Sequence, residues 1–326
     1  MLVDSFSRVH NYLRISITNN CNLRCFYCMP DEDYEVTPSS QIMQADEINE
    51  IARIFVQLGV NKIRLTGGEP LVRKDAATII EQLSDYPVEL TLTTNGTRLH
   101  EFLPVLKNAG IRSINVSLDT LDRDKFQMMT KRDQYQKVLD NIRLLSVENI
   151  HIKVNVVMMK GVNDSEINDF VAMTKDLPVH IRFIEFMPFS GNHWESQKVF
   201  GWKQILHVVE QKYDFIKLKD EVHDTAKKYI VPGHVGTFAV ISTITSPFCG
   251  DCNRMRLTAD GKMKNCLFSQ TETDLLSALR RGEDIVPLIK QSISAKAAER
   301  GGQFGPNIEE MDTTAMKNRS MISIGG

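Results

Sequence analysis

The sequence predicts an α/β fold, an incomplete (βα)6 TIM-type barrel followed by a C-terminal segment. The first observation is a series of short apolar runs, at residues 12–18, 62–66, 88–94, 113–118, 152–158 and 181–186. The second is that segments between these runs carry apolar residues at helical spacing. In residues 47–58 that stripe consists of Ile48, Ile51, Phe55 and Leu58. Repeated strand and helix units are typical of a parallel sheet with helices outside, so we expect a barrel over 1–235 and a C-terminal region over 236–326.

Composition and charge are those of an ordinary globular protein. The chain has 326 residues, of which 42% are hydrophobic and 25% are charged, and its net charge is -2. So small a net charge argues against general nucleic-acid binding. The first residues lack the basic and apolar regions of a signal peptide, and no apolar run is long enough to cross a membrane. We therefore expect a cytoplasmic protein, where thiols stay reduced and can hold metal.

The loop after the first predicted strand carries a cysteine triplet with C-x3-C-x2-C spacing, formed by Cys21, Cys25 and Cys28. Chemistry in such barrels gathers at the carboxyl ends of the strands, where this loop lies. Three cysteines are one ligand short of a closed zinc site, whereas a four-iron cluster held by three thiolates keeps one iron free for a small molecule. The spacing favours the iron-sulfur cluster, and a zinc knuckle or three unrelated thiols is the alternative.

The other three cysteines form a second triplet near the C-terminus, at Cys249, Cys252 and Cys266. This triplet is also one ligand short of the usual structural zinc set. A second open-sited iron-sulfur cluster accounts for it directly. A zinc site completed by a histidine such as His234 is the alternative.

Strand alternation predicts a ring of cations inside the barrel. In the first strand, Leu13 and Ile15 lie on the face opposite Arg14. The same parity puts one cation on the inner face of each of four strands: Arg14, Arg64, Lys153 and Arg182. Buried charges are costly unless paired, and Arg matches phosphate oxygens well, so a polyphosphate substrate is the expected partner. The alternative is that these cations pair with local carboxylates such as Glu185.

Polar segments follow the other strands. Gly67-Gly68-Glu69-Pro70 comes after the second strand, and glycines there allow a ligand to approach the backbone closely. The third and fourth strands end in Thr93-Thr94-Asn95-Gly96 and Ser117-Leu118-Asp119, which either bind a ligand or cap helices. Arg254 and Arg256 follow Cys252 and share one face of an extended segment, so both can reach one anion. A polar tail from about Gln303 is expected to be mobile.

The first triplet with its aromatic Tyr27, together with the Gly67-Gly68-Glu69-Pro70 turn, resembles the radical S-adenosylmethionine (SAM) enzymes. With the second triplet, the Arg254 and Arg256 pair and the terminal Gly325-Gly326, the set is similar to the branch of that family that begins molybdenum cofactor biosynthesis. The resemblance implies two [4Fe-4S] clusters, one at each triplet, with SAM bound to the first.

The resemblance also implies a role for individual positions. The residues that would contact SAM are Tyr27, Gly68, Ser117 and Met187. Those that would bind GTP are Arg14, Arg64, Thr93, Lys153, Arg182, Arg254 and Arg256. Gly325 and Gly326 would reach into the active site and assist catalysis.

The implied reaction converts GTP to (8S)-3',8-cyclo-7,8-dihydroguanosine 5'-triphosphate. SAM would yield a 5'-deoxyadenosyl radical that takes the hydrogen from C3' of GTP, and C3' would then bond to C8 of guanine. An unknown electron donor, the next enzyme of molybdenum cofactor synthesis and a second copy in a homodimer are the other implied partners. The alternatives are a radical SAM enzyme that modifies a peptide and a non-enzymatic zinc-binding module.

Overall fold

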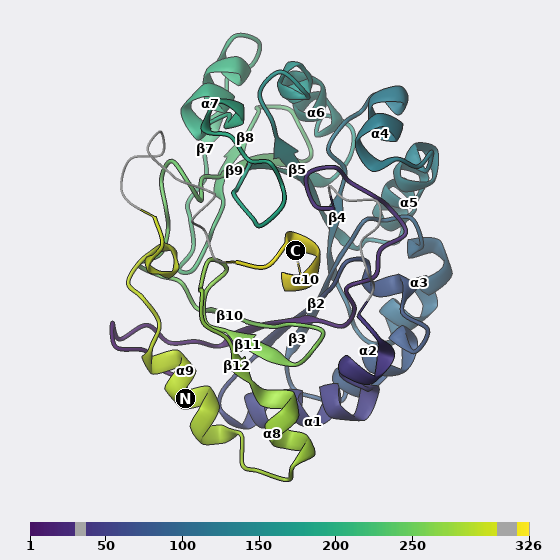
Figure 1. Ribbon diagram of the computed structural model, residues 1–326. Helices are drawn as coiled ribbons and strands as arrows, with labels where there is room; N and C mark the ends of the chain where they lie inside the picture. The colour runs from purple at the N-terminus through teal and green to yellow at the C-terminus, as the bar shows by residue number, and fades with distance from the viewer. Residues whose placement is uncertain (30–36, 305–317, 326) are drawn as a thin grey trace.

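The computed structural model describes residues 1–29, 37–304 and 318–325. Its centre is a barrel-shaped sheet with helices around the outside (Figure 1). The six predicted strands are confirmed, with ends displaced by at most two residues: β1 (Tyr12–Ser16), β2 (Lys62–Thr66), β3 (Glu89–Thr94), β4 (Ser113–Ser117), β5 (His151–Met158) and β6 (Val179–Glu185). Each strand pairs with the next in parallel, as the strand and helix alternation predicts.

Strands from the C-terminal region extend this sheet at both edges. β9 (Thr237–Ile241) pairs in parallel with β6, and β10 (Arg254–Leu257) pairs in parallel with β1. Antiparallel strands lie beyond them: β8 (Lys227–Ile230) and β7 (Ile216–Lys217) beyond β9, and β11 (Lys262–Lys264) and β12 (Thr273–Asp274) beyond β10. The cysteines of the second triplet therefore lie next to the first strand of the barrel, although they are far from it in sequence.

Most helices cover the outer face of the sheet. They are α1 (Ala45–Gln57), α2 (Ala76–Ser84), α3 (Leu99–Asn108), α4 (Arg123–Thr130), α5 (Tyr135–Val147), α6 (Ile167–Met173), α7 (Trp202–Glu210), α8 (Leu275–Arg280) and α9 (Val286–Ser294). Short 3-10 helices lie at Ser39–Gln41, Pro70–Val72, Asp164–Glu166, Ser196–Lys198 and Arg300–Gly302. α10 (Met321–Ile324) is the exception, because it lies inside the mouth of the barrel beside the C-terminal end of the chain (Figure 1).

α1 shows why the helices form and how they pack. Its N-terminus is closed by Glu47, whose side chain accepts the backbone N–H of Gln44 at 2.7 Å. The predicted stripe faces the sheet, and Ile48, Ile51 and Phe55 are fully buried. Leu58 follows the last turn as the C-cap residue and is only half-buried.

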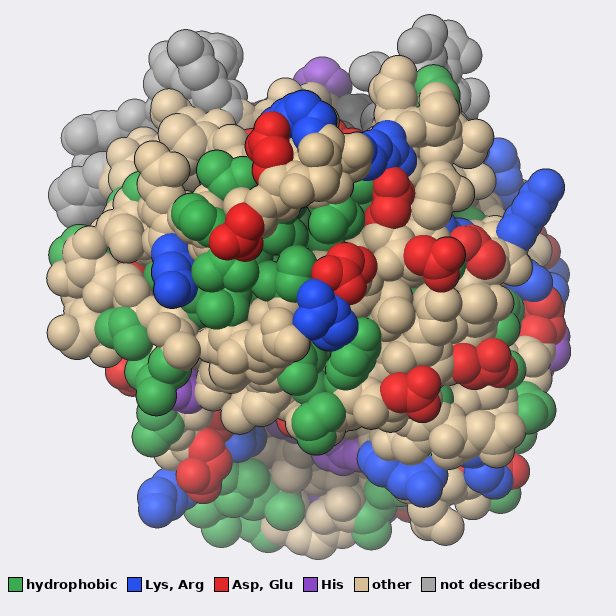
Figure 2. All heavy atoms as spheres, turned by 90° about the horizontal axis from the view of Figure 1, so that it is seen from below, with side chains coloured by type: hydrophobic (Ala, Val, Ile, Leu, Met, Phe, Trp, Pro, Cys, Tyr) green, Lys and Arg blue, Asp and Glu red, His purple; other side chains and the backbone are tan. Residues whose placement is uncertain are grey.

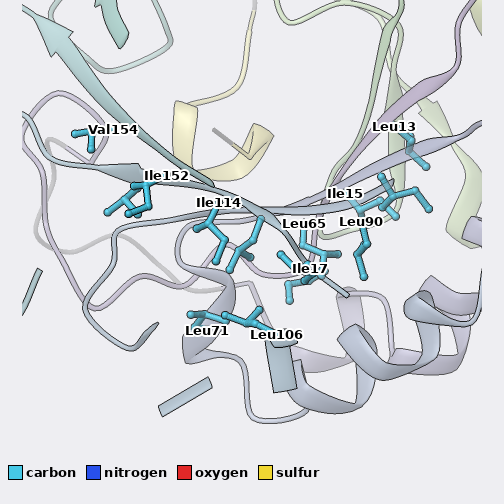
Figure 3. Close-up of a cluster of buried hydrophobic side chains, with 14 of the residues drawn as sticks. Leu13, Ile15, Ile17, Leu65, Leu71, Leu90, Leu106, Ile114, Ile152 and Val154 are labelled. Carbon is cyan, nitrogen blue, oxygen red and sulfur yellow. The ribbon is translucent and has the colours of Figure 1, made fainter. Parts of the chain in front are cut away.

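The hydrophobic core lies between the sheet and the outer helices. Leu13, Ile15 and Ile17 point into it, together with side chains from the neighbouring strands (Figure 3). Burying each such side chain stabilises the fold by about 1.5–3 kcal/mol. Truncating the fully buried Ile15 to Ala is expected to cost about 2–5 kcal/mol, since the packed surroundings cannot fill the cavity. Because side chains alternate along a strand, the apolar residues face the outer helices and the polar residues between them face the interior of the barrel.

The outer surface mixes charges of both signs. On the face seen in Figure 2, acidic and basic side chains are interspersed with apolar ones, and neither sign forms a continuous field. This mixture agrees with the net charge of -2. Across the described residues, every helix is too short or too polar to span a bilayer.

Candidate active site

The loop after β1 holds the first cysteine triplet against its neighbours. The backbone N–H of Arg24 donates to the carbonyl oxygen of Thr130, at the end of α4, at 2.8 Å. Within the loop, the N–H of Leu23 points at the sulfur of Cys21 at 3.4 Å. The side-chain amide of Asn95, from the loop after β3, lies 3.7 Å from the same sulfur. The loop is thus fixed from several sides, and Cys21 receives two N–H groups.

The three thiols of this triplet suit a multi-iron cluster. All six cysteines of the chain are free, and the charge of Cys21 acts on the thiols of both Cys25 and Cys28. Burial is the main cause that raises the pKa of Cys21 to about 11 and that of Cys28 to about 12, and it raises that of Cys25 as well. Thiolates at these positions therefore require nearby positive charge, which iron ions would supply.

Tyr27 and Ser117 line one small cavity together with Cys25. The hydroxyl of Tyr27 donates to Asp119 Oδ2 at 2.5 Å, and Asp119 Oδ1 accepts the N–H of Val157 at 2.8 Å. Burial raises the pKa of Asp119 to about 6 in spite of these hydrogen bonds. The sequence placed Asp119 at the end of the fourth strand, but only the structure shows that it positions Tyr27.

The Gly67-Gly68-Glu69 turn lies directly against the loop after β1. The N–H of Gly68 donates to the carbonyl of Thr18 at 2.8 Å, and a Cβ on Gly68 would lie 2.4 Å from the carbonyl oxygen of Asn20. Only glycine fits at such a distance. The turn therefore brings the predicted SAM contact Gly68 next to the segment that leads to Cys21.

Glu69 is a second site residue that the sequence analysis did not single out. It is fully buried, and its carboxylate accepts the N–H of Leu71 at 3.0 Å, the hydroxyl of Thr94 at 2.8 Å and the N–H of Asn95 at 2.6 Å. Burial raises its pKa to about 7 against the effect of these donors. Glu69 thus ties the turn after β2 to the loop after β3. Thr94 and Asn95 serve this link, since α3 begins after Arg98 and neither of them caps it.

The second triplet lies around β10 and β11, at the edge of the sheet next to β1. Cys249 and Cys252 lie between β9 and β10, and Cys266 follows β11. His234 lies at the opposite end of β9, where its Nδ1 is 2.8 Å from the hydroxyl of Thr174. It therefore does not complete a zinc site with these cysteines. In the described parts of the chain, no three His, Cys, Asp or Glu side chains are arranged to hold a single metal ion, and this applies to the two cysteine triplets as well.

The predicted cations meet inside the barrel. In the register of the strands, Arg14 lies between Arg64 on one side and Arg256 on the other. Lys153 and Arg182 lie on β5 and β6; the charge of Arg182 acts on Lys153, and the charge of Arg64 acts on both. Arg254, on the same strand as Arg256, completes the set of six, and its charge acts on both Arg14 and Arg256.

Electrostatics show how strongly positive this interior is. Burial is the main cause that lowers the pKa of Arg14 to about 10, of Arg182 to about 9 and of Lys153 to about 8, and neighbouring cations lower each further. Burial alone would raise the pKa of the Tyr12 hydroxyl, but Arg64 and Arg14 lower it to about 8. Such a site binds an anion strongly.

Two of these cations form hydrogen bonds with neutral side chains. Arg64 donates to the Tyr12 hydroxyl, and Arg182 donates to Asn155 Oδ1 at 2.5 Å. The carboxylate of Glu185 instead accepts backbone N–H groups, those of Trp202 at 3.1 Å and of Ile244 and Thr245 at 2.9 Å each. The alternative that Glu185 neutralises the inward cations is therefore wrong. Thr93 lies on the same inner face, where its hydroxyl accepts from Asn115 Nδ2 at 3.3 Å.

The end of the chain enters the same interior. The guanidinium of Arg256 donates to the carbonyl oxygen of Gly325. Gly325 has φ +84°, and a Cβ there would lie 2.5 Å from the hydroxyl oxygen of Thr66. Gly326 and residues 305–317 of the predicted mobile tail lie outside the described residues. Within residues 318–325, Ile322 and Ile324 are buried.

Met187 lies beside this end of the chain and not in the cavity of Tyr27 and Ser117. It packs with Cys266 against an apolar cluster formed by Phe189, Ile244, Phe268 and Ile324. The structure therefore places this predicted SAM contact in the same apolar cluster as Cys266 and Ile324. The other predicted SAM contacts lie near the first triplet: Tyr27 and Ser117 line one cavity with Cys25, and Gly68 contacts Asn20.

Comparison with known proteins agrees with these features. The family model described as "Radical SAM superfamily" matches residues 15–174, and the model described as "Molybdenum Cofactor Synthesis C" matches residues 179–301. A protein of Arabidopsis thaliana named mitochondrial GTP 3',8-cyclase is 44% identical over 333 residues, which cover all of this chain and 84% of that protein. The chain belongs to the GTP 3',8-cyclase family of radical SAM enzymes. The resemblance found in the sequence is thereby confirmed.

Other members of the GTP 3',8-cyclase family match over the whole chain. A GTP 3',8-cyclase of Peptoclostridium acidaminophilum is 43% identical, with coverage of 100% of this chain and 98% of that protein. Molybdenum cofactor biosynthesis protein 1 of Mus musculus is 44% identical over 99% of this chain. The chain spans about half of that longer relative, 51% of its length.

Solved structures support the fold. SuiB of Streptococcus suis superposes with a TM-score of 0.65 over 90% of this chain and 67% of that protein, at 16% sequence identity. A structure of SuiB bound to S-adenosylmethionine gives a TM-score of 0.62, also at 16% identity. At so low an identity, the likeness shows the radical SAM fold and carries no information on the substrate.

Proposed function

We propose that this chain converts GTP to (8S)-3',8-cyclo-7,8-dihydroguanosine 5'-triphosphate, the first step of molybdenum cofactor biosynthesis. The observation that carries the proposal is the group of six cations on the inner face of the barrel, whose charges act on one another. A triphosphate fits this field, since it offers several negative charges at once. The names of the full-length relatives support the choice of GTP.

The inward side chains would bind and orient the nucleotide. Each hydrogen bond from a charged donor to phosphate contributes about 1.5–3 kcal/mol net, so several of them hold the triphosphate firmly. The proposed binding residues are Arg14, Arg64, Thr93, Lys153, Arg182, Arg254 and Arg256. Because they come from β1, β2, β3, β5, β6 and β10, they can grip the nucleotide from all around the interior and hold its reacting end in one orientation.

The cysteine triplets would hold the cofactors. Cys21, Cys25 and Cys28 would hold the [4Fe-4S] cluster of the radical SAM family, and Cys249, Cys252 and Cys266 would hold a second one. Tyr27, Gly68, Ser117 and Met187 are the proposed contacts of SAM. When bound, the first cluster and SAM supply a carbon radical that takes a hydrogen atom from the substrate. The chain's own task is to seat both ligands and to exclude water.

Asp119 and Glu69 would support the SAM side of the site. Asp119 fixes the ring of Tyr27 through the 2.5 Å hydrogen bond, and Glu69 fixes the turn that carries Gly68. Both carboxyl groups are buried, so neither is free to move toward solvent. They act as positioning residues for the proposed SAM contacts.

The terminal Gly325 and Gly326 are proposed to assist catalysis from the C-terminal side. For Gly325, this role is supported by the hydrogen bond from Arg256 to its carbonyl oxygen and by its positive φ. A homodimer, a cytoplasmic location, an unidentified electron donor and transfer of the product to the next enzyme of the pathway belong to the same proposal. These four points come from the family resemblance.

The test is an anaerobic reaction of the iron-sulfur-reconstituted protein with SAM, dithionite and either GTP or ATP. Mass spectrometry would follow both 5'-deoxyadenosine and the nucleotides. We expect deoxyadenosine together with a cyclised isomer of GTP, and no such product from ATP. SAM cleavage without any change in GTP would contradict GTP as the substrate and favour the alternative of a radical SAM enzyme that modifies a peptide. If protein loaded with both clusters cleaved no SAM, the assignment as an enzyme would be contradicted.

A further inference from the structure

Lys296 is a buried cation for which the proposed reaction has no role. Its residue is only 4% exposed, and it follows α9 on the outer side of the second triplet. Its ammonium group donates to the sulfur of Cys252 at 3.4 Å and to the carbonyl oxygen of Arg254 at 3.0 Å. One side chain thus joins a proposed cluster ligand to the backbone of a proposed substrate-binding residue.

The ammonium group of Lys296 faces sulfur in a buried setting. Burial disfavours its charged form most, the charges of Cys252 and Cys266 favour that form, and the charge of Arg254 opposes it. His10 also lies within range of its charge. Burying an ammonium is costly unless it is paired, and a methionine would fill the same space without that cost. The use of Lys here therefore indicates an interaction with negative sulfur.

The segment that carries Lys296 is held tightly around the triplet. The N–H of Arg300 points at the sulfur of Cys249 at 3.5 Å. From the N-terminal segment, the guanidinium of Arg8 donates to the carbonyl oxygens of Cys249 at 2.8 Å, Ala298 at 2.7 Å and Ala297 at 2.9 Å. Two of the three sulfurs thus receive an N–H group from residues 296–300, and Lys296 cannot swing away without breaking this packing.

We propose that Lys296 tunes and positions the second iron-sulfur cluster, through the hydrogen bond from its ammonium group to the Cys252 sulfur. This inference rests on the second cluster of the proposed function. Hydrogen bonds to cluster sulfurs and net charge set the reduction potential of such clusters. A positive donor stabilises the reduced state, which carries one more negative charge, and therefore raises the potential. The contact with the Arg254 carbonyl holds the strand that carries Arg254 at a fixed position relative to the cluster.

The experiment compares Lys296→Met, Lys296→Arg and Lys290→Met. Lys290 lies on α9 and is exposed, so Lys290→Met makes the same chemical change as Lys296→Met at a position on the surface. Each change is placed in a full-length background in which Cys21, Cys25 and Cys28 are replaced by Ser, so that the second cluster alone gives a signal. Iron and sulfide per chain are measured after anaerobic reconstitution, and the midpoint potential is measured by redox titration followed by electron paramagnetic resonance.

We expect Lys296→Met to shift the midpoint potential to a more negative value, or to lose second-cluster iron that Lys296→Arg retains, while Lys290→Met matches the background. A cluster in Lys296→Met with unchanged iron content and unchanged potential would overturn the role of Lys296 and leave the proposed function intact. A background protein that binds no iron and sulfide at all would overturn the second cluster, and with it this inference.

Discussion

Arg319 forms a two-pronged ion pair with Asp260, with both nitrogen to oxygen distances at 2.8 Å. The same guanidinium also contacts the carboxylate of Glu272, at 2.7 and 2.6 Å. Asp260 lies in the turn between β10 and β11, and Glu272 lies just before β12. Arg319 therefore fastens the end of the chain to the strands around the second triplet, six residues before Gly325.

Replacing Arg319 with Gln should release this attachment. We expect turnover of GTP to fall by about 10- to 100-fold, because Gly325 loses its fixed position. The affinity for GTP should hardly change, and global stability should fall by only about 1 kcal/mol or less. The measurements are turnover, GTP binding and hydrogen exchange of residues 318–325.

Arg280→Gln is the matched control for Arg319, since it breaks a similar pair with Glu47 on the outer surface. It should leave turnover and exchange of the chain end unchanged. Equal losses in the two variants would mean that the effect of Arg319 is a general one on the fold. A weakened GTP affinity as the main effect would contradict the positioning role.

A side chain at position 325 should displace the end of the chain. Gly325→Ala puts a Cβ 2.5 Å from the Thr66 hydroxyl oxygen at a residue with φ +84°. We expect slower turnover with GTP affinity within about twofold, as for deletion of Gly325 and Gly326. Gly110→Ala is the control, because Gly110 has φ +68° but open space around it. If both variants behave alike, backbone strain and not the contact with Thr66 is responsible.

Binding of GTP should weaken as the pH rises from about 7 to about 9. The pKa of Lys153 is lowered to about 8, first by burial and then by Arg182 and Arg64. Its ammonium is therefore charged below that pH and neutral above it, and only the charged form attracts phosphate. Loss of one such contact is worth about 1.5 kcal/mol, roughly tenfold in affinity. Calorimetric titrations across this range would measure it.

The variant Lys153→Met should bind GTP more weakly at neutral pH and show a flatter dependence on pH than the wild type. An unchanged slope in Lys153→Met would show that another group controls the binding.

Single cysteine changes should separate the two triplets. Cys28→Ser is expected to abolish SAM cleavage, because the first triplet would lose one of its three ligands. Cys266→Ser should still permit cleavage of SAM but uncouple it from GTP. The measurement is the ratio of cyclised product to 5'-deoxyadenosine. Unchanged product formation in Cys266→Ser would rule out the second cluster as part of the site.

Much of the barrel could be predicted because its strands are local apolar runs with clear alternation. The parity that puts Leu13 and Ile15 in the core also puts Arg14 inside, and the structure places it there. β9 was not predicted. β10 was expected only as an extended segment that carries Arg254 and Arg256, and its parallel pairing with β1 shows that it belongs to the sheet. Pairing across more than two hundred residues leaves no trace in local periodicity.

The site was predictable where residue types are chemically specific and not where they act on other side chains. Cysteine spacing indicated both triplets directly. Asp119, Glu69, Lys296 and Arg319 act through neighbours brought together by the fold, and no spacing pattern marks them. α10 was not predicted for a related reason: four residues are too few to show helical periodicity, and tertiary contacts hold them in the helix.

The most direct test of the central claim is a reaction with GTP that carries deuterium at C3'. The account predicts that one deuterium from this position appears in the 5'-deoxyadenosine, seen by mass spectrometry together with the cyclised nucleotide. Deoxyadenosine free of deuterium, formed alongside consumed GTP, would contradict hydrogen removal at C3' and with it the proposed cyclisation.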